Sequence, residues 1–203
     1  MKQSRHKYQS RFFIISGPSG VGKSTLLARL VKRNNPQGKL VKSVSLTTRP
    51  KRPGEKEARD YFFVSDKEFR QRKKAHKILE WTRYLSYDYG TPKEFIEEQR
   101  AKGKHVLFCL DIKGAFRIKR LYPQNAVTIF IAPPSIKTLN YRIKKRCRKT
   151  DKQEVCQRLR LARQELKASR AYDYCLLNQY LPGVVKELQE IILKETGYTT
   201  RKR

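Results

Sequence analysis

Long apolar runs are absent from this chain. No segment approaches the roughly 20 consecutive apolar residues that a membrane-spanning helix needs. The residues before Phe12 are polar and basic, without the apolar stretch of a signal peptide. The sequence therefore predicts a soluble intracellular protein that does not cross a membrane, with residues 1–11 and 196–203 as basic tails.

Paired cysteines are absent as well. The chain has four cysteines and three histidines, but no C-x-x-C pair and no spacing typical of a metal site. Because cytosolic proteins keep their thiols reduced, we expect free, buried thiols and no disulfides. The cysteines are Cys109, Cys147, Cys156 and Cys175.

Acidic residues are scarce, and this scarcity sets the charge of the molecule. The 18 Asp and Glu stand against 48 Lys and Arg, which gives a formal net charge of +30. A charge of this size raises the affinity for polyanions, and nucleotides, nucleic acids and anionic membranes all qualify. With 203 residues, of which 38% are hydrophobic, the chain can form one domain with a substantial core.

The strongest motif that is present is a glycine-rich segment fitting the phosphate-loop pattern G-x-x-x-x-G-K-[ST]. Its glycines allow backbone N–H groups to surround phosphate oxygens at the start of a helix. Lys23 is predicted to reach the β- and γ-phosphates of a nucleotide, and the Ser24 hydroxyl to complete a Mg²⁺ shell. A turn that binds nothing is the alternative, which the apolar strand pattern before the loop and the helical pattern after it disfavour. The segment is Gly17, Pro18, Ser19, Gly20, Val21, Gly22, Lys23, Ser24 and Thr25.

Strand-like and helix-like segments alternate along the rest of the chain, which predicts an α/β three-layer fold around a mainly parallel sheet. Ser65 is expected to cap one helix, and Thr91 and Pro92 to begin another as its cap and first residue. The main predicted strands are 12–15, 40–45, 78–84, 106–110, 127–131 and 174–177.

Three segments are candidates for ligand binding, each with a plainer alternative. The loop at 46–55 carries arginines that suit a second anion site, or it is a solvated basic turn. Glu80 lies among aromatics that can form either a base pocket or the core of a small sheet. Asp111 ends an apolar strand, where acids face the ligand crevice of parallel sheets. The basic helical hairpin at 135–169 is either a lid over transferring phosphate or a solvated pair of helices.

Together these segments resemble the guanylate kinase family, which moves the γ-phosphate of ATP to GMP. The similarity extends from about Phe12 to Leu193, and residues 44–49 (V-S-L-T-T-R), 52–55 (R-P-G-E) and 89–91 (Y-G-T) carry most of it. It implies a P-loop nucleoside monophosphate kinase fold over 12–195, with a GMP-binding part at about 42–98 and a helical lid at about 135–169. It also implies a cytoplasmic enzyme with GMP and ATP as substrates and Mg²⁺ as cofactor; monomer and dimer both stay open.

The same resemblance assigns roles to individual residues. It places Asn178 near the adenine, and Cys109 stands where the family usually has an acid. The residues implied to bind GMP are Ser45, Arg49, Arg52, Tyr61, Glu80, Tyr89, Thr91 and Asp111. The residues implied to act in catalysis are Lys23, Arg49, Arg142, Arg146 and Arg158.

Two rival functions remain at this stage. A related kinase could use another acceptor, such as a ribose bisphosphate, although the segments 47–61 and 89–91 argue against it. Alternatively, a domain that has lost catalysis could hold nucleic acid or an acidic protein, which Cys109 and the net charge of +30 favour. In a working enzyme the same charge predicts only non-specific polyanion binding.

Overall fold

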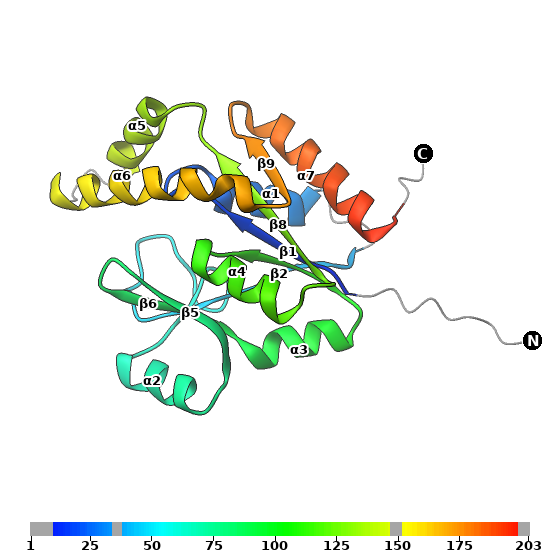
Figure 1. Ribbon diagram of the computed structural model, residues 1–203. Helices are drawn as coiled ribbons and strands as arrows, with labels where there is room; N and C mark the ends of the chain where they lie inside the picture. The colour runs from blue at the N-terminus through cyan, green and yellow to red at the C-terminus, as the bar shows by residue number, and fades with distance from the viewer. Residues whose placement is uncertain (1–9, 34–37, 147–151, 199–203) are drawn as a thin grey trace, which may run out of the picture.

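The computed structural model describes residues 10–33, 38–146 and 152–198. Its centre is a five-stranded sheet in the order β2-β7-β1-β8-β9 (Figure 1). All pairs in this sheet are parallel, which confirms the expected mainly parallel α/β fold. The strands are β1 (Phe12–Ser16), β2 (Leu40–Lys42), β7 (His105–Cys109), β8 (Ala126–Ala132) and β9 (Tyr174–Leu177).

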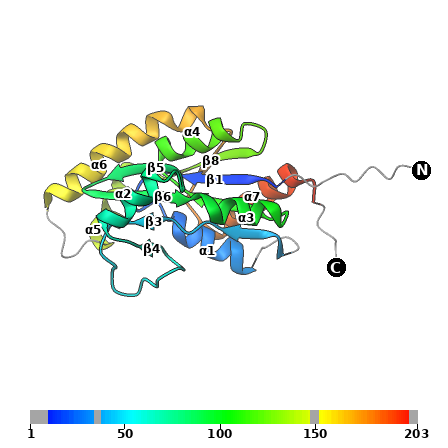
Figure 2. The ribbon, with the colours of Figure 1, turned by 90° about the horizontal axis from the view of Figure 1, so that it is seen from below.

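Helices cover both faces of this sheet, because alternate residues of the buried strands point to opposite sides. Phe13 and Ile15 of β1 pack with α1 and α7, whereas Phe12 and Ile14 pack with α3 and α4. Figure 2 shows α1 and α4 on opposite sides of β1. The helices are α1 (Lys23–Arg33), α3 (Lys93–Ala101), α4 (Ile112–Leu121) and α7 (Leu181–Thr196).

A second, four-stranded sheet lies beside the first, in the order β4-β3-β6-β5. Its β3/β4 pair is parallel and its other pairs are antiparallel. This sheet and α2 span residues 46–92, inside the segment expected to bind GMP. The elements are β3 (Leu46–Thr47), β4 (Phe62–Phe63), α2 (Asp66–Lys74), β5 (Ile78–Tyr84) and β6 (Tyr87–Pro92).

The basic hairpin forms two helices at the upper left of Figure 1, α5 (Ile136–Arg146) and α6 (Lys152–Lys167). The 3₁₀ turn η2 (Ala168–Ala171) follows α6. Leu139 and Ile143 of α5 and Ala162 of α6 are buried in the same apolar cluster as α1. The hairpin therefore packs over the end of the sheet at which the phosphate loop lies.

Several local expectations can be compared with the structure. Ser65 does cap α2, since its side chain accepts a hydrogen bond from the Glu68 amide. The expectation for Thr91 and Pro92 is wrong: both belong to β6, and α3 begins at Lys93 without a side-chain cap. The Thr91 hydroxyl donates instead to Glu80, because strand pairing places the two side chains together.

The thiols are free but not uniformly buried. Cys109, Cys156 and Cys175 form no disulfide, and Cys147 lies outside the described residues. Cys109 is half-buried, but Cys156 and Cys175 are exposed, so the expectation of burial is wrong for these two. In the part of the chain that the structure describes, no helix is both long and apolar enough to cross a membrane.

Candidate active site

The phosphate loop, the second sheet and the helical hairpin enclose a cleft of about 1180 Å³. Most residues predicted to bind nucleotide line this one cleft, although they come from distant parts of the sequence. Those that line it are Gly17, Ser19, Gly20, Gly22, Lys23, Ser24, Thr25, Ser45, Arg49, Arg52, Tyr61, Glu80, Tyr89, Asp111, Arg142 and Arg158. Pro18, Val21, Thr91 and Asn178 do not line it, and the Arg146 side chain lies outside the described residues.

The phosphate loop joins β1 to α1 in a backbone conformation that only glycine adopts easily. Gly17 has φ of +142° and Gly22 has φ of +104°. A Cβ on Gly17 would lie 2.3 Å from the Ile131 carbonyl oxygen, and one on Gly22 would lie 2.9 Å from Asn178 Nδ2. Gly17 and Gly22 are therefore required both by their backbone conformation and by the lack of space for a Cβ.

Asn178 stabilises this loop through a hydrogen bond to its backbone. Its Nδ2 donates to the Val21 carbonyl oxygen over 2.6 Å, and the side chain is buried. Asn178 therefore contacts the phosphate loop directly. Its proximity to the adenine stays a prediction.

Cationic side chains converge on the phosphate loop from two directions. Lys23 Nζ donates to the carbonyl oxygens of Gly17 and Pro18 at the loop's own start. Arg158 of α6 donates through Nη1 to Ser19 Oγ over 2.9 Å, and Arg142 Nη1 of α5 lies 3.5 Å from the Val21 carbonyl oxygen. A phosphate chain on this loop would meet positive charge from the loop and from the hairpin.

Arg49 lies on the opposite wall of the cleft and is only 6% exposed. Its Nη2 donates to both carboxylate oxygens of Glu55 over 2.8 and 2.9 Å, and its Nη1 donates to the Pro50 carbonyl oxygen over 2.7 Å. The guanidinium also lies 5.5 Å from the ring centroid of Tyr61. Because both terminal nitrogens donate hydrogen bonds, the guanidinium plane is held in one orientation.

Glu55 lines the cleft but was not among the site residues predicted from the sequence. Besides binding Arg49, its Oε2 accepts a hydrogen bond from the Arg52 amide over 2.9 Å. Glu55 thus connects both arginines of the predicted phosphate-binding loop. Its position three residues after Arg52 was the available signal.

Glu80 is the most buried acid of the cleft, with 5% exposure. Its Oε1 accepts a hydrogen bond from Thr91 Oγ1 over 2.6 Å. Burial raises the pKa of Glu80 to about 7; the Thr91 hydroxyl lowers it, and the Asp111 charge raises it further. A ligand with N–H donors facing this carboxyl group would stabilise its charged form and lower its pKa.

Helix α4 begins beside Glu80, and its N-cap residue Asp111 and its residue Gly114 are joined there by a hydrogen bond. Asp111 Oδ1 caps the helix by accepting from the Gly114 amide over 2.8 Å. A Cβ on Gly114 would lie 2.6 Å from Glu80 Oε2, so any other residue would displace the carboxylate. Gly114 was not predicted as a site residue, because this contact arises only from the tertiary structure.

Glu165 of α6 is a further acid of the cleft that the sequence reasoning missed. Burial raises its pKa to about 7, an effect that Lys23 opposes and Asp111 reinforces. In the sequence, Glu165 is a single acid after several arginines, and nothing in this pattern indicates that it lies in a ligand site. The structure brings it close enough to Lys23 and Asp111 to respond to both charges.

The residues present fit a Mg²⁺ ion bound together with nucleotide phosphates. The Ser24 hydroxyl lies in the first turn of α1 and lines the cleft, together with the carboxylates of Asp111 and Glu165. Among the described residues there is no group of three metal-ligating side chains, and Mg²⁺ bound with nucleotides takes phosphate and water oxygens for most of its shell. Cys109 lines the same cleft.

Comparisons with known proteins agree with this geometry. The guanylate kinase family model matches residues 9–195. A guanylate kinase from Gloeobacter violaceus is 41% identical over 187 residues, covering 92% of this chain and 88% of that protein. The guanylate kinase from Thermotoga maritima is 39% identical over 194 residues, covering 95% of this chain and 91% of that protein.

A solved structure gives the same result. The crystal structure of guanylate kinase from Anaplasma phagocytophilum is similar with a TM-score of 0.75 and 31% identity, covering 93% of this chain and 87% of that chain. The fold and the resemblance seen in the sequence are both confirmed, and a nucleotide-binding kinase is the class of enzyme to which these relatives belong. The chain is therefore a member of the guanylate kinase family.

Proposed function

We propose that this chain transfers the γ-phosphate of ATP to GMP and so produces ADP and GDP. The observation that carries the proposal is the Glu80–Thr91 pair, buried in the same cleft as a phosphate loop. A loop of this kind occurs in many users of ATP and GTP, but a buried carboxylate opposite it selects a particular acceptor base.

Guanine matches this carboxylate because its N1–H and its N2 amine are two donors on one edge. Glu80 offers two acceptor oxygens, and Thr91 holds one of them in place. Adenine has an acceptor at N1 and no amine at C2, so it would leave the ionised Glu80 carboxylate desolvated and unpaired. Rejecting AMP in this way is worth roughly 1–3 kcal/mol or more.

Ser45, Arg49, Arg52, Tyr61 and Tyr89 would hold the GMP phosphate. All five line the cleft, and all five come from the segment 42–98. Glu55 fixes the Arg49 guanidinium before substrate arrives, so less conformational freedom is lost on binding. The acceptor oxygen would then face the phosphates held by the loop.

The transfer itself needs positioning and charge neutralisation rather than a covalent enzyme intermediate. Lys23, Arg142, Arg146 and Arg158 would spread the charge that develops on the transferring phosphoryl group. Mg²⁺ bound with ATP, held through Ser24, would neutralise part of the same charge. Closure of the hairpin α5–α6 would exclude water, which otherwise competes with GMP as the acceptor.

We place the reaction in the cytoplasm, which supplies ATP and keeps thiols such as Cys109 and Cys156 reduced. The test is a coupled assay of ADP formation with ATP, Mg²⁺ and GMP, using wild type and Lys23→Ala. Wild type should turn over with GDP as product. Lys23→Ala should lose activity but stay folded, because Lys23 is only partly buried and its hydrogen bonds, to the Gly17 and Pro18 carbonyl oxygens, stay within the phosphate loop. Near-normal turnover of folded Lys23→Ala, or ADP formation that does not need GMP, would contradict the proposal.

A further inference from the structure

Helices α4 and α6 each carry a stripe of exposed cations that does not line the cleft. The α4 stripe is Lys113, Arg117 and Arg120, and the second stripe runs from α6 into η2 as Arg163, Lys167 and Arg170. Both follow the spacing i, i+4, i+7, which places side chains on one side of a helix. All six residues are exposed.

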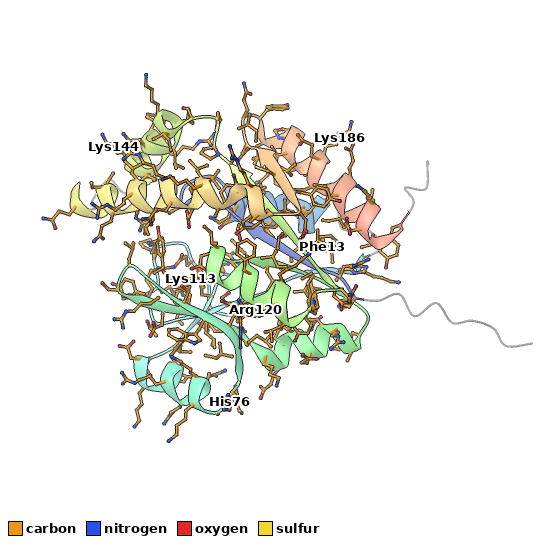
Figure 3. The ribbon with its side chains drawn as sticks, viewed as in Figure 1. Phe13, His76, Lys113, Arg120, Lys144 and Lys186 are labelled. Carbon is orange, nitrogen blue, oxygen red and sulfur yellow. The ribbon has the colours of Figure 1, made fainter. Side chains whose placement is uncertain are left out.

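The two stripes belong to neighbouring elements. Leu166 of α6 packs in the same apolar cluster as Ala115 and Phe116 of α4, and the Phe116 and Tyr172 ring centroids lie 5.2 Å apart. Figures 1 and 2 both show α4 beside the C-terminal part of α6, and Figure 3 labels Lys113 and Arg120 on α4. We call the surface formed by the six cations the α4–α6 face.

The structure describes no carboxylate that pairs with this face. In residues 10–33, 38–146 and 152–198, none of the six cations forms an ion pair with a carboxylate. Helix α4 contains no Asp or Glu, and Glu165 of α6 lines the cleft instead. The remaining cation of α4, Lys119, is already paired with Asp173 over 2.9 Å.

The proposed kinase reaction does not account for this face. None of the six cations lines the nucleotide cleft. Like charges at i, i+4 destabilise an isolated helix by about 0.2–0.5 kcal/mol per pair, so both stripes work against the stability of the helices that carry them. An external polyanion would remove this repulsion.

We propose that the α4–α6 face binds the sugar-phosphate backbone of a single nucleic acid strand without reading its sequence. Four of the six cations are arginines, whose planar forks match phosphate oxygens. An anionic membrane is a poorer partner, because a membrane-surface helix buries apolar side chains in the lipid, whereas Ala115 and Ile118 of α4 are buried in the protein core.

The test measures binding of a fluorescein-labelled oligouridylate of about 20 nucleotides by anisotropy, between about 50 and 200 mM salt. The variant is Lys113→Gln/Arg117→Gln/Arg120→Gln. The matched control is Lys67→Gln/Arg70→Gln/Lys74→Gln, which removes three exposed cations from α2, a helix that also carries Asp66 and Glu68. A second variant, Arg163→Gln/Lys167→Gln/Arg170→Gln, tests the other stripe and serves if the α4 variant does not fold.

Each phosphate contact contributes about 0.7 to the slope of log affinity against log salt for single strands. Either stripe variant should therefore lower the slope by about 2 and the affinity by about tenfold or more, and the α2 control should change both far less. GMP kinase activity should be the same in all four proteins, since none of these residues lines the cleft.

Three results would overturn the proposal. An equal loss in the stripe variants and the α2 control would mean that only net charge matters. Unchanged binding in both stripe variants would place the contact elsewhere on the molecule. Binding to phosphatidylserine vesicles or heparin, lost in the stripe variants, together with no binding to oligouridylate, would assign the face to another kind of polyanion.

Discussion

Glu80→Gln tests the reasoning about the acceptor base through its pH dependence. In the ligand-free protein the pKa of Glu80 is raised to about 7, mainly by burial. Two N–H donors of guanine would bind only the ionised carboxylate, so GMP must select this form. The ionised fraction is about one tenth at pH 6 and about nine tenths at pH 8 for a group with this pKa.

The affinity of wild type for GMP should therefore rise by about tenfold between pH 6 and pH 8 through Glu80 alone. The GMP phosphate also titrates, with a pKa of about 6. Its effect on the pH dependence of GMP affinity is the same in wild type and in Glu80→Gln. The ratio of wild-type to variant affinity isolates the carboxyl group. Titration calorimetry at three pH values measures it, and a ratio that does not change with pH would refute the assignment.

Thr91→Val provides a second variant for the same experiment. The Thr91 hydroxyl stabilises the charged form of Glu80 and lowers its pKa. Its removal should shift the rise in GMP affinity to higher pH without abolishing it. An unchanged pH dependence would show that the hydrogen bond does not act on the carboxylate, and a shift to lower pH would contradict the direction of its effect.

The same pKa makes a prediction for the stability of the ligand-free protein. The ordinary pKa of the carboxyl group is 4.5 and the folded value is about 7, so the folded state binds the proton more tightly than the unfolded state. This contribution to stability is complete below pH 4.5 and is lost as pH rises through 7, by at most about 3 kcal/mol. Relative to wild type, Glu80→Gln should gain about 2 kcal/mol between pH 5 and pH 8 in urea unfolding, and a constant difference would contradict this.

Other perturbations follow from the same structure. Arg52→Lys keeps the charge but loses the fork, so GMP should bind more weakly by about 1–3 kcal/mol; unchanged GMP affinity would make this loop a solvated turn. Arg49→Lys should weaken GMP binding similarly and also lower the melting temperature, because a Lys ammonium cannot replace the guanidinium hydrogen bonds to both Glu55 oxygens and to the Pro50 carbonyl oxygen; an unchanged melting temperature would contradict the role given to Glu55. The pKa of buried His105 is lowered to about 4, by burial and then by Lys39 and Arg11, so wild type should lose stability as pH falls from about 6.5 to about 4. His105→Gln should lose less over this range in urea unfolding, and an equal loss would place the effect elsewhere.

Features that depend on local sequence were the ones that could be predicted. The phosphate loop required its glycines in a particular backbone conformation, and Gly17 and Gly22 have it. Strands β5 and β9 have the predicted bounds, because each is a strand-like segment bounded by turns. The resemblance then identified residues from distant segments that the structure brings into one cleft.

Features that depend on tertiary contacts could not be predicted. Thr91 has the local sequence of a helix cap, but pairing of β6 with β5 directs its hydroxyl to Glu80. Gly114 matters because a Cβ there would meet a carboxylate from another segment. Glu165 gains its altered pKa only where α6 buries it near Lys23 and Asp111.

The most direct test of guanine as the acceptor base is the ratio of kcat/KM for GMP to that for AMP, in wild type and in Glu80→Gln, with ATP and Mg²⁺ at saturation. Wild type should strongly prefer GMP. In the variant one acceptor oxygen is replaced by a donor amide that faces the donors of guanine, whereas N1 of adenine can accept from it. The ratio should therefore fall at least tenfold, equivalent to about 1.4 kcal/mol. A ratio unchanged in the folded variant would remove Glu80 from the base site and contradict the assignment of GMP as the acceptor.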